Sequence, residues 1–225
     1  MMVENAIILA AGRSLQLDGK NKVLIKHPVT RKTILDYAIE AFAGKRVTVV
    51  VGYGALKIME RYPQLNYVLN ENWATTNNAM SLGLALLENM DPTYVVSGDM
   101  FFNRELISEM DNGKNNIVLT QNRDNRMLSS IHCAMGQQEK IIETYQGPIR
   151  SVSHPEAMGL FKLSDEKLLG EWRNRCLCHS NLFVAQALPC TEETLVYAHD
   201  VGRNYFKEIN SAADYLRLMK EALAK

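Results

Sequence analysis

A short segment near the start of the chain combines small and basic residues in a way that suits phosphate binding. Its small residues are Ala10, Ala11, Gly12 and Ser14. Its cations are Arg13, Lys20, Lys22 and Lys26. Short side chains let a ligand approach the backbone N–H groups, and an array of exposed N–H groups binds anions. Because the 25 basic and 25 acidic residues balance to no net charge, this local excess of positive charge predicts a polyphosphate site.

Two better-known phosphate loops do not match this segment. The dinucleotide-binding loop needs Gly-x-Gly-x-x-Gly, and no glycine follows Gly12 before Gly19. The P-loop needs Gly-x-x-x-x-Gly-Lys followed by serine or threonine, whereas Gly19 and its lysine are followed by Asn21, and Ser14 stands at the first glycine position. A solvated basic turn between a strand and a helix is the alternative interpretation.

A second segment with hydrogen-bonding side chains opens the helix that we predict over residues 76–90. Its polar residues are Thr75, Thr76, Asn77, Asn78 and Ser81. They offer donors and acceptors at a helix N-terminus, where the positive end of the helix dipole also favours phosphate. Thr75 or Thr76 is the predicted N-cap. The segment is a second candidate for ligand binding, with a simple N-cap as the alternative.

Both segments fall at junctions of a repeating strand-helix pattern. Short apolar runs predict strands buried on both faces at residues 6–10, 47–51, 67–69 and 94–96. Apolar stripes predict helices at residues 33–42, 56–62 and 76–90. In a largely parallel sheet the carboxyl ends of the strands border the ligand crevice, so Asp99, which follows the fourth strand, is expected there.

The second half of the chain has short strands separated by polar turns. The predicted strands are 116–120, 129–134, 140–144 and 157–162, and the predicted helices are 163–173, 180–188 and 211–223. We expect these strands to add antiparallel pairs at one edge of the sheet. The whole pattern predicts an α/β protein, a three-layer α/β/α sandwich with a Rossmann-like, mostly parallel mixed sheet. Residues 1–225 are expected to form one domain, with halves at 1–112 and 113–225.

The composition argues against several classes of protein. A hydrophobic fraction of 47% is typical of a globular chain with a buried core. Zero net charge argues against a nucleic-acid or membrane partner held by bulk charge, and no apolar run reaches the ~18 residues of a membrane span. The 4 cysteines are expected to stay reduced, in keeping with a cytoplasmic protein. The last predicted helix has an apolar face that could contact a second copy of the chain, so a homodimer is an open alternative.

The order of these segments resembles a known family. The run Ile8-Leu9-Ala10-Ala11-Gly12, the basic loop and then Lys22-Val23-Leu24 resemble the signature of MobA-like NTP transferases, a family of nucleotidyltransferases. Three positions depart from the glycine, arginine and proline of that signature, namely Ser14, Gln16 and Asn21. Residues 70–82, 97–100 and 206–216 resemble later segments of the family. The chain looks most like the small cytidylyltransferases that act on phosphocholine or 2-aminoethylphosphonate.

The resemblance implies a fold of the nucleotide-diphospho-sugar transferase type, with nucleotide bound by residues 1–112 and acceptor by residues 113–225. The implied nucleotide-binding residues are Leu9, Ala10, Ala11, Gly12, Arg13, Ser14, Lys22, Gly52, Thr76, Asn77, Ser81 and Gly98. It also implies that Asp99 and Asn210 hold Mg²⁺. In catalysis Lys22 would neutralise charge at the α-phosphate, and Arg13 would assist the leaving pyrophosphate.

The acceptor is expected to carry a phosphate or phosphonate. The candidates to bind it are Asn78, Arg123, Arg126, Arg150 and Lys162. Aromatic residues are sparse between positions 123 and 190, which argues against the ring cage that a choline group needs. We therefore expect magnesium-dependent transfer of CMP from CTP to a small phosphonate or phosphorylated alcohol or amine, with release of pyrophosphate. A sugar-1-phosphate or molybdopterin nucleotidyltransferase and a catalytically inactive nucleotide-binding regulator are the alternatives.

Overall fold

Strands and helices alternate along the chain in a computed structural model that describes residues 3–17, 19–123, 126 and 128–223. The strands are β1 (Asn5–Ala10), β2 (Arg46–Val51), β3 (Asn66–Leu69), β4 (Thr93–Ser97), β5 (Met100–Phe102), β6 (Ile117–Gln121), β7 (Ile131–Met135), β8 (Ile141–Gln146), β9 (Glu156–Leu163), β10 (Tyr197–Asp200) and β11 (Phe206–Glu208). The α-helices are α1 (Ile34–Ala41), α2 (Ala55–Arg61), α3 (Asn78–Glu88), α4 (Arg104–Asp111), α5 (Glu166–Cys178), α6 (Val184–Ala187) and α7 (Ala212–Leu223). Short 3₁₀ helices are η1 (Leu15–Leu17), η2 (Lys22–Leu24) and η3 (Gln137–Glu139).

The large sheet is mixed and mostly parallel, as the sequence predicts. Its main path runs β10-β6-β9-β4-β1-β2-β3. Strands β1, β2, β3 and β4 run parallel to one another, and β10 is parallel to β6. Strand β9 runs antiparallel to both β4 and β6. The strands predicted in the second half all lie beyond β4, at one edge of the parallel strands β1–β4, and pair antiparallel, which confirms that prediction. The apolar residues of β9 are buried on both faces because β6 and β10 extend the sheet beyond it.

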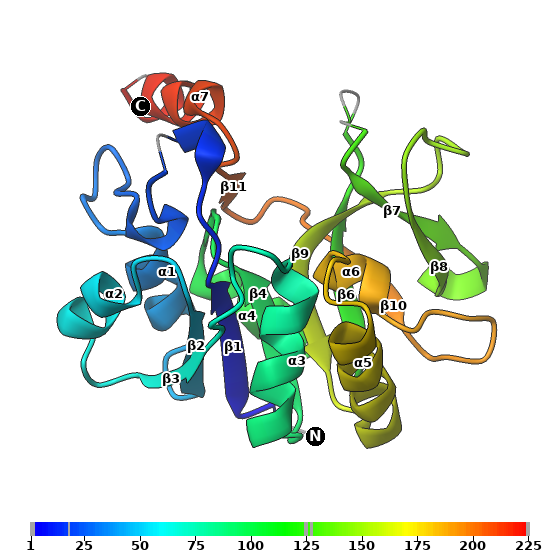
Figure 1. Cartoon of the computed structure of the whole chain (residues 1–225). Helices are drawn as coiled ribbons and strands as arrows, with labels where there is room; N and C mark the ends of the chain where they lie inside the picture. Colours follow the sequence, from blue (N-terminus) through cyan, green and yellow to red (C-terminus); the bar gives the residue numbers. More distant parts are fainter. Residues whose placement is uncertain (1–2, 18, 124–125, 127, 224–225) are drawn as a thin grey trace.

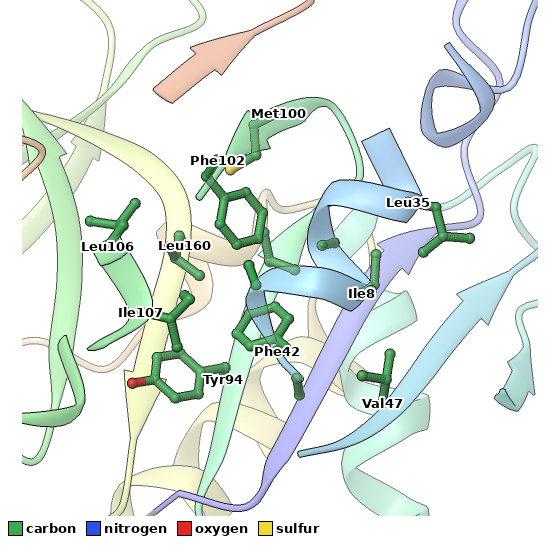
Figure 2. Close-up of a cluster of buried hydrophobic side chains, with 14 of the residues drawn as sticks. Ile8, Leu35, Phe42, Val47, Tyr94, Met100, Phe102, Leu106, Ile107 and Leu160 are labelled. Atoms are coloured by element: carbon green, nitrogen blue, oxygen red, sulfur yellow. The ribbon is translucent and has the colours of Figure 1, made fainter. Parts of the chain in front are cut away.

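Helices cover both faces of this sheet, which confirms the three-layer arrangement. The side chains of β1 alternate between two clusters, with Ile8 in one and Ile7 in the other. The first cluster includes residues of α1, α2 and α4, and Figure 2 shows Ile8, Tyr94 and Leu160 of the sheet beside Phe42 and Ile107 of the helical layer. The second includes residues of α3, α5 and α6, and Figure 1 shows α3 and α5 side by side over this face.

Side-chain caps set where several helices begin. Helix α1 starts after Thr33, whose hydroxyl accepts a hydrogen bond from the Asp36 N–H in a capping box. Helix α3 is capped by Asn77, not by Thr75 or Thr76 as the sequence suggested. The helix predicted at 180–188 shrinks to α6, because the Ser180 carbonyl accepts a hydrogen bond from the N–H of Asn77 and is held in an irregular segment.

Two short strands bring distant parts of the chain to the carboxyl end of β4. Strand β11 pairs antiparallel with β5, and the Ile209 N–H donates to the Asp99 carbonyl at 2.7 Å. Helix α7 follows and packs Leu218 against Ile34, Phe101 and Ile209, whereas Leu216 of the same helix is exposed. Strands β7 and β8 form an arm that projects beyond the sheet on the side opposite α2 (Figure 1).

Within residues 3–17, 19–123, 126 and 128–223, no helix has both the length and the apolar character needed to cross a membrane.

Candidate active site

A crevice of three adjoining pockets follows the carboxyl ends of β1 and β4. We call them the narrow pocket, of about 100 Å³, the central pocket, of about 460 Å³, and the outer chamber, of about 380 Å³. Asn78 lines all three, so the pockets share their walls. Asp99 and Asn210 line both the central pocket and the outer chamber. A ligand with three parts could therefore lie along the crevice in a single extended pose.

The loop after β1 forms one wall of the central pocket. Its lining residues include Leu9, Ala10, Gly12, Arg13 and Ser14. A Cβ atom added to Gly12 would have no heavy atom within 4 Å, so this glycine borders open space. Gly98 is different, because a Cβ there would lie 2.5 Å from Val23 Cγ1 and 2.7 Å from the Leu9 carbonyl oxygen. Gly98 allows close packing of the backbone, whereas Gly12 leaves room for a ligand.

Gly52 serves packing and does not line the narrow or central pocket. A Cβ on Gly52 would lie 2.7 Å from Trp73 Cβ and 2.8 Å from the Ala11 carbonyl oxygen. The residue therefore lets Trp73, which lines the narrow pocket, pack closely over the end of β2.

Lys22 joins the two predicted metal ligands at the floor of the crevice. Its Nζ donates to Asp99 Oδ2 at 3.1 Å and to Asn210 Oδ1 at 2.8 Å, across 77 and 188 residues of sequence. Helix η2 carries Lys22, the end of β4 carries Asp99, and the turn before α7 carries Asn210. Ser211, rather than Asn210, begins that helix through its hydrogen bonds with Asp214. The side-chain oxygen of Asn210 is therefore directed to the crevice and not to a helix cap.

The oxygens around Lys22 suit a hard divalent cation. Asp99 Oδ1 is buried and has no hydrogen-bond partner among the described residues. A buried carboxylate oxygen without a hydrogen-bond partner lowers the stability of a folded protein unless a bound ligand supplies the partner. Among the described residues, no three His, Cys, Asp or Glu side chains gather at a metal site. Mg²⁺ needs only one or two protein oxygens when phosphates and water supply the rest, so Asp99 and Asn210 fit it.

The narrow pocket presents fixed polar groups beside an indole ring. The buried Asn70 side chain donates to Thr76 Oγ1 at 3.2 Å and to Ser81 Oγ at 3.1 Å. Asn70 Oδ1 accepts from the Asn72 N–H at 3.0 Å, so its amide orientation is fixed. The predicted ligand-binding residues that line this pocket are Leu9, Ala11, Gly12, Thr76, Asn77, Asn78 and Ser81. The sequence analysis did not nominate Asn70, although it directly follows β3, much as Asp99 follows β4.

The outer chamber contains acidic residues that the sequence reading did not nominate. Glu156 and Glu208 line it together with Asp99. Arg123 donates to Glu208 at 3.0 Å and lies 4.0 Å from Glu156. Burial, and then the negative charge of Asp99, raise the pKa of Glu208, while Arg123 opposes this shift. Glu208 lies two residues before Asn210, in the segment whose resemblance to the family suggested the metal site. This short spacing is the feature of the sequence that could have identified Glu208 as a site residue.

None of the four predicted acceptor-binding cations lines the outer chamber, and three of them bind groups elsewhere. Lys162 is 1% exposed and donates to the Met110 carbonyl at 2.7 Å, so its assignment to the acceptor is corrected to a structural role at the end of α4. Arg150 pairs with Glu143 at 2.8 Å on the exposed side of β8. Arg126 donates to the His154 carbonyl. Asn78 does line the chamber, but its Oδ1 also accepts from the Val184 N–H at 2.8 Å.

The open α/β sheet, the crevice at the ends of its parallel strands and the glycine loop after β1 form the arrangement expected of nucleotidyltransferases. Residues 6–142 match the family described as the MobA-like NTP transferase domain, and the chain belongs to that family.

Solved structures with the same fold cover nearly the whole chain. The CTP:phosphocholine cytidylyltransferase LicC from Streptococcus pneumoniae is similar over 99% of this chain and 100% of its own, with a TM-score of 0.79 at 20% identity. The inositol-1-phosphate CTP transferase from T. maritima is similar over 98% and 96%, with a TM-score of 0.73 at 17% identity. A nucleoside-diphosphate-sugar pyrophosphorylase from Vibrio cholerae RC9 is similar over 95% and 99%, with a TM-score of 0.73 at 13% identity.

Sequence relatives match a shorter part of the chain. The bifunctional protein GlmU of Burkholderia thailandensis is 32% identical over 102 residues, which cover 43% of this chain. The same protein of Burkholderia mallei matches to the same extent. These matches span 22% of the length of the curated relatives.

Proposed function

We propose that the protein transfers CMP from CTP to a small phosphonate or a phosphorylated amino alcohol, with release of pyrophosphate. The observation that carries the proposal is the contact of one lysine nitrogen, Lys22 Nζ, with both Asp99 and Asn210. A cation and two hard oxygens meet there beside a glycine loop, in the middle of a crevice that can hold a nucleotide and an acceptor end to end.

In this reaction an acceptor oxygen attacks the α-phosphorus, and the bond from that phosphorus to the pyrophosphate oxygen breaks. The Gly12 loop binds the phosphates through backbone N–H groups and keeps them in place. Lys22 balances negative charge at the α-phosphate, and Arg13, also in the central pocket, balances charge on the departing pyrophosphate. A phosphate or phosphonate acceptor is already anionic near neutral pH, so no residue needs to remove a proton from it.

Bound Mg²⁺ supplies charge neutralisation to the phosphate oxygens. Asp99 and Asn210 would hold it, and Lys22 would then exchange its contacts with these two residues for contacts with phosphate. The buried Asp99 Oδ1, without a partner in the described part of the chain, supports this assignment.

The narrow pocket supports a pyrimidine base. Its volume of about 100 Å³ is small, and its polar lining of Asn70, Thr76 and Ser81 offers hydrogen bonds to the edge of a ring. Two of the similar structures are named for enzymes that use CTP. These observations favour CTP over purine triphosphates.

The proposal is tested by measuring pyrophosphate release with CTP, UTP, ATP and GTP. Each nucleotide is paired with 2-aminoethylphosphonate, phosphoethanolamine, phosphocholine and glucose 1-phosphate in the presence of Mg²⁺. We expect the highest kcat/KM for CTP with one of the first three acceptors. Preference for UTP or another nucleotide with glucose 1-phosphate would instead identify a sugar-1-phosphate nucleotidyltransferase.

A catalytically inactive regulator is the candidate from another class. Gln16 lines the central pocket at a position where the family signature has arginine, so one phosphate contact differs. Tight CTP binding in a calorimeter without pyrophosphate release from any nucleotide and acceptor pair would favour the regulator and refute the transferase.

A further inference from the structure

We propose that Glu156 binds the ammonium group of an acceptor that carries a primary amine at the end opposite its phosphate or phosphonate. The inference rests on the proposed function and gives the acceptor a chemical class and a specificity-determining residue.

The outer chamber is acidic where an acceptor would extend away from the nucleotide. Its ionisable lining residues, within the described part of the chain, are Asp99, Glu156 and Glu208, and neither lysine nor arginine lines it. Arg123 is the cation that reaches these carboxylates, at 3.0 Å from Glu208 and 4.0 Å from Glu156. Lys22 pairs with Asp99, and the two glutamates share Arg123, so the three carboxylates exceed their cations by one negative charge, which favours a positively charged ligand group.

Arg123 is committed mainly to other partners. Its Nε donates to Gln121 Oε1 at 2.9 Å, and its Nη1 donates to Glu208 at 3.0 Å. The 4.0 Å separation from Glu156 exceeds the length of a hydrogen bond. Asp99 has its own cation in Lys22. Glu156 is therefore the lining carboxylate with the weakest charge compensation.

The backbone holds Glu156 firmly at the chamber wall. It is the first residue of β9 and lies opposite both Gln121 of β6 and His132 of β7 in the sheet. Its side chain is only 13% exposed, and a partly desolvated carboxylate gains most from a ligand that brings a charged hydrogen-bond donor. A strand position also limits the entropy that Glu156 loses when it binds.

Charge changes sign along the crevice. Arg13 and Lys22 line the central pocket, while Glu156 and Glu208 line the outer chamber and not the central pocket. An amino-phosphonate or phospho-amino alcohol has the matching polarity, with its anionic group toward Lys22 and its ammonium toward Glu156. A sugar phosphate has no cation for the acidic end.

A quaternary ammonium fits the chamber less well than a primary one. It has no N–H to donate to a carboxylate, and its usual binding site is a cage of several aromatic rings. Phe183 is the one aromatic side chain among the described residues that line the chamber. A primary ammonium has three donors, which suit a carboxylate acceptor.

The test compares acceptors that differ only in the amine. The pairs are 2-aminoethylphosphonate with propylphosphonate, and phosphoethanolamine with propyl phosphate, in which a methyl group replaces the ammonium. We expect the wild type to favour the amine of at least one pair by on the order of 10- to 100-fold in kcat/KM, the range typical of a hydrogen bond to a charged group. Glu156→Gln should reduce this preference to a few-fold by raising the KM of the amine alone. Glu143→Gln, which alters an exposed carboxylate paired with Arg150, should leave the preference unchanged.

Two outcomes would overturn the inference while leaving the proposed function intact. Pyrophosphate could be released equally well with amine and methyl acceptors, or Glu156→Gln could lower kcat/KM equally for both. If no acceptor supports release with CTP, the proposed function fails, and thermal shifts with Mg²⁺, CTP and each acceptor decide the inference separately. Stabilisation by the amine compounds alone, lost in Glu156→Gln, would support it; equal shifts or no shifts would refute it.

Discussion

Two pockets of the crevice, the central pocket and the outer chamber, are built in different ways. Much of the central pocket comes from one continuous segment, the loop after β1, whose backbone approaches the ligand at Gly12. The outer chamber is assembled from side chains of β9, β11 and the segment before α6, which are distant in sequence. Backbone groups bind what all nucleoside triphosphates share, namely phosphates, whereas side chains can change without altering the fold. On the proposed function, acceptor specificity would therefore reside in the side chains of the outer chamber.

Asp99→Asn should have the largest effect on activity, because Asp99 lines both the central pocket and the outer chamber. The change keeps the shape of the side chain and removes the anionic oxygen that would hold Mg²⁺. We expect pyrophosphate release to fall by about 10³-fold or more. Release is measured against Mg²⁺ concentration, with the melting temperature as a control for folding. An unchanged magnesium dependence would remove Asp99 from the metal site.

Lys22→Ala, in the central pocket, should have the second largest effect on activity. We expect turnover to fall by roughly 10²–10³-fold, as when one preorganised donor to a developing charge is removed. Lys26→Ala is the matched control, because Lys26 belongs to the same basic segment but does not line the crevice. Steady-state rates at saturating CTP are compared for the two variants. Equal losses in both would mean that bulk charge, and not a positioned ammonium, matters.

Gly12→Ala should weaken CTP binding without destabilising the fold. The added methyl group meets no protein atom within 4 Å, so it enters space that the ligand would use. We expect an increase in Kd on the order of tenfold, equivalent to about 1.4 kcal/mol, with an unchanged melting temperature. Gly170→Ala in α5, where a Cβ has only an ordinary contact at 3.8 Å, is the control. A normal Kd for the Gly12 variant would show that phosphate does not approach this backbone.

Lys162→Met should have the smallest effect on catalysis, since its amine is bound to the Met110 carbonyl, outside the crevice. Burial lowers the pKa of this lysine. We expect an unchanged acceptor KM and a stability loss of about 1–3 kcal/mol, because a buried carbonyl loses its partner. Urea denaturation and acceptor kinetics measure the two effects. A raised acceptor KM with normal stability would instead show that Lys162 binds the acceptor.

The nucleotide end could be predicted from the sequence because its signals are local. The apolar run of β1, Gly12 and the nearby cations lie within a short stretch, and strand ends in a parallel sheet meet at one edge. These local signals pointed to Lys22 and Asp99, whereas Asn210 was named only because residues 206–216 resemble a segment of the family; the structure brings the three side chains into contact. The α/β sandwich followed from the same periodic patterns.

The acceptor end could not be predicted, because nothing local distinguishes a binding arginine from a structural one. Arg123 was nominated for its charge, but Glu208 of β11, 85 residues away, binds it. Lys162 has the same side chain as Lys22, yet the position of β9 inside the sheet buries it. Glu156 gave no signal in the sequence, since its role depends on the pairing of β9 with β6 and β7.

A single site shared by the metal ion and the triphosphate is the central claim of the proposed function. Measuring CTP binding to the wild type and to the Asn210→Ala variant tests this claim most directly. Isothermal titration calorimetry with and without Mg²⁺ gives the four dissociation constants. We expect Mg²⁺ to tighten CTP binding to the wild type and to have a much smaller effect in the variant, because Asn210 Oδ1 contributes to the metal site. Equal enhancement by Mg²⁺ in both proteins would contradict the account.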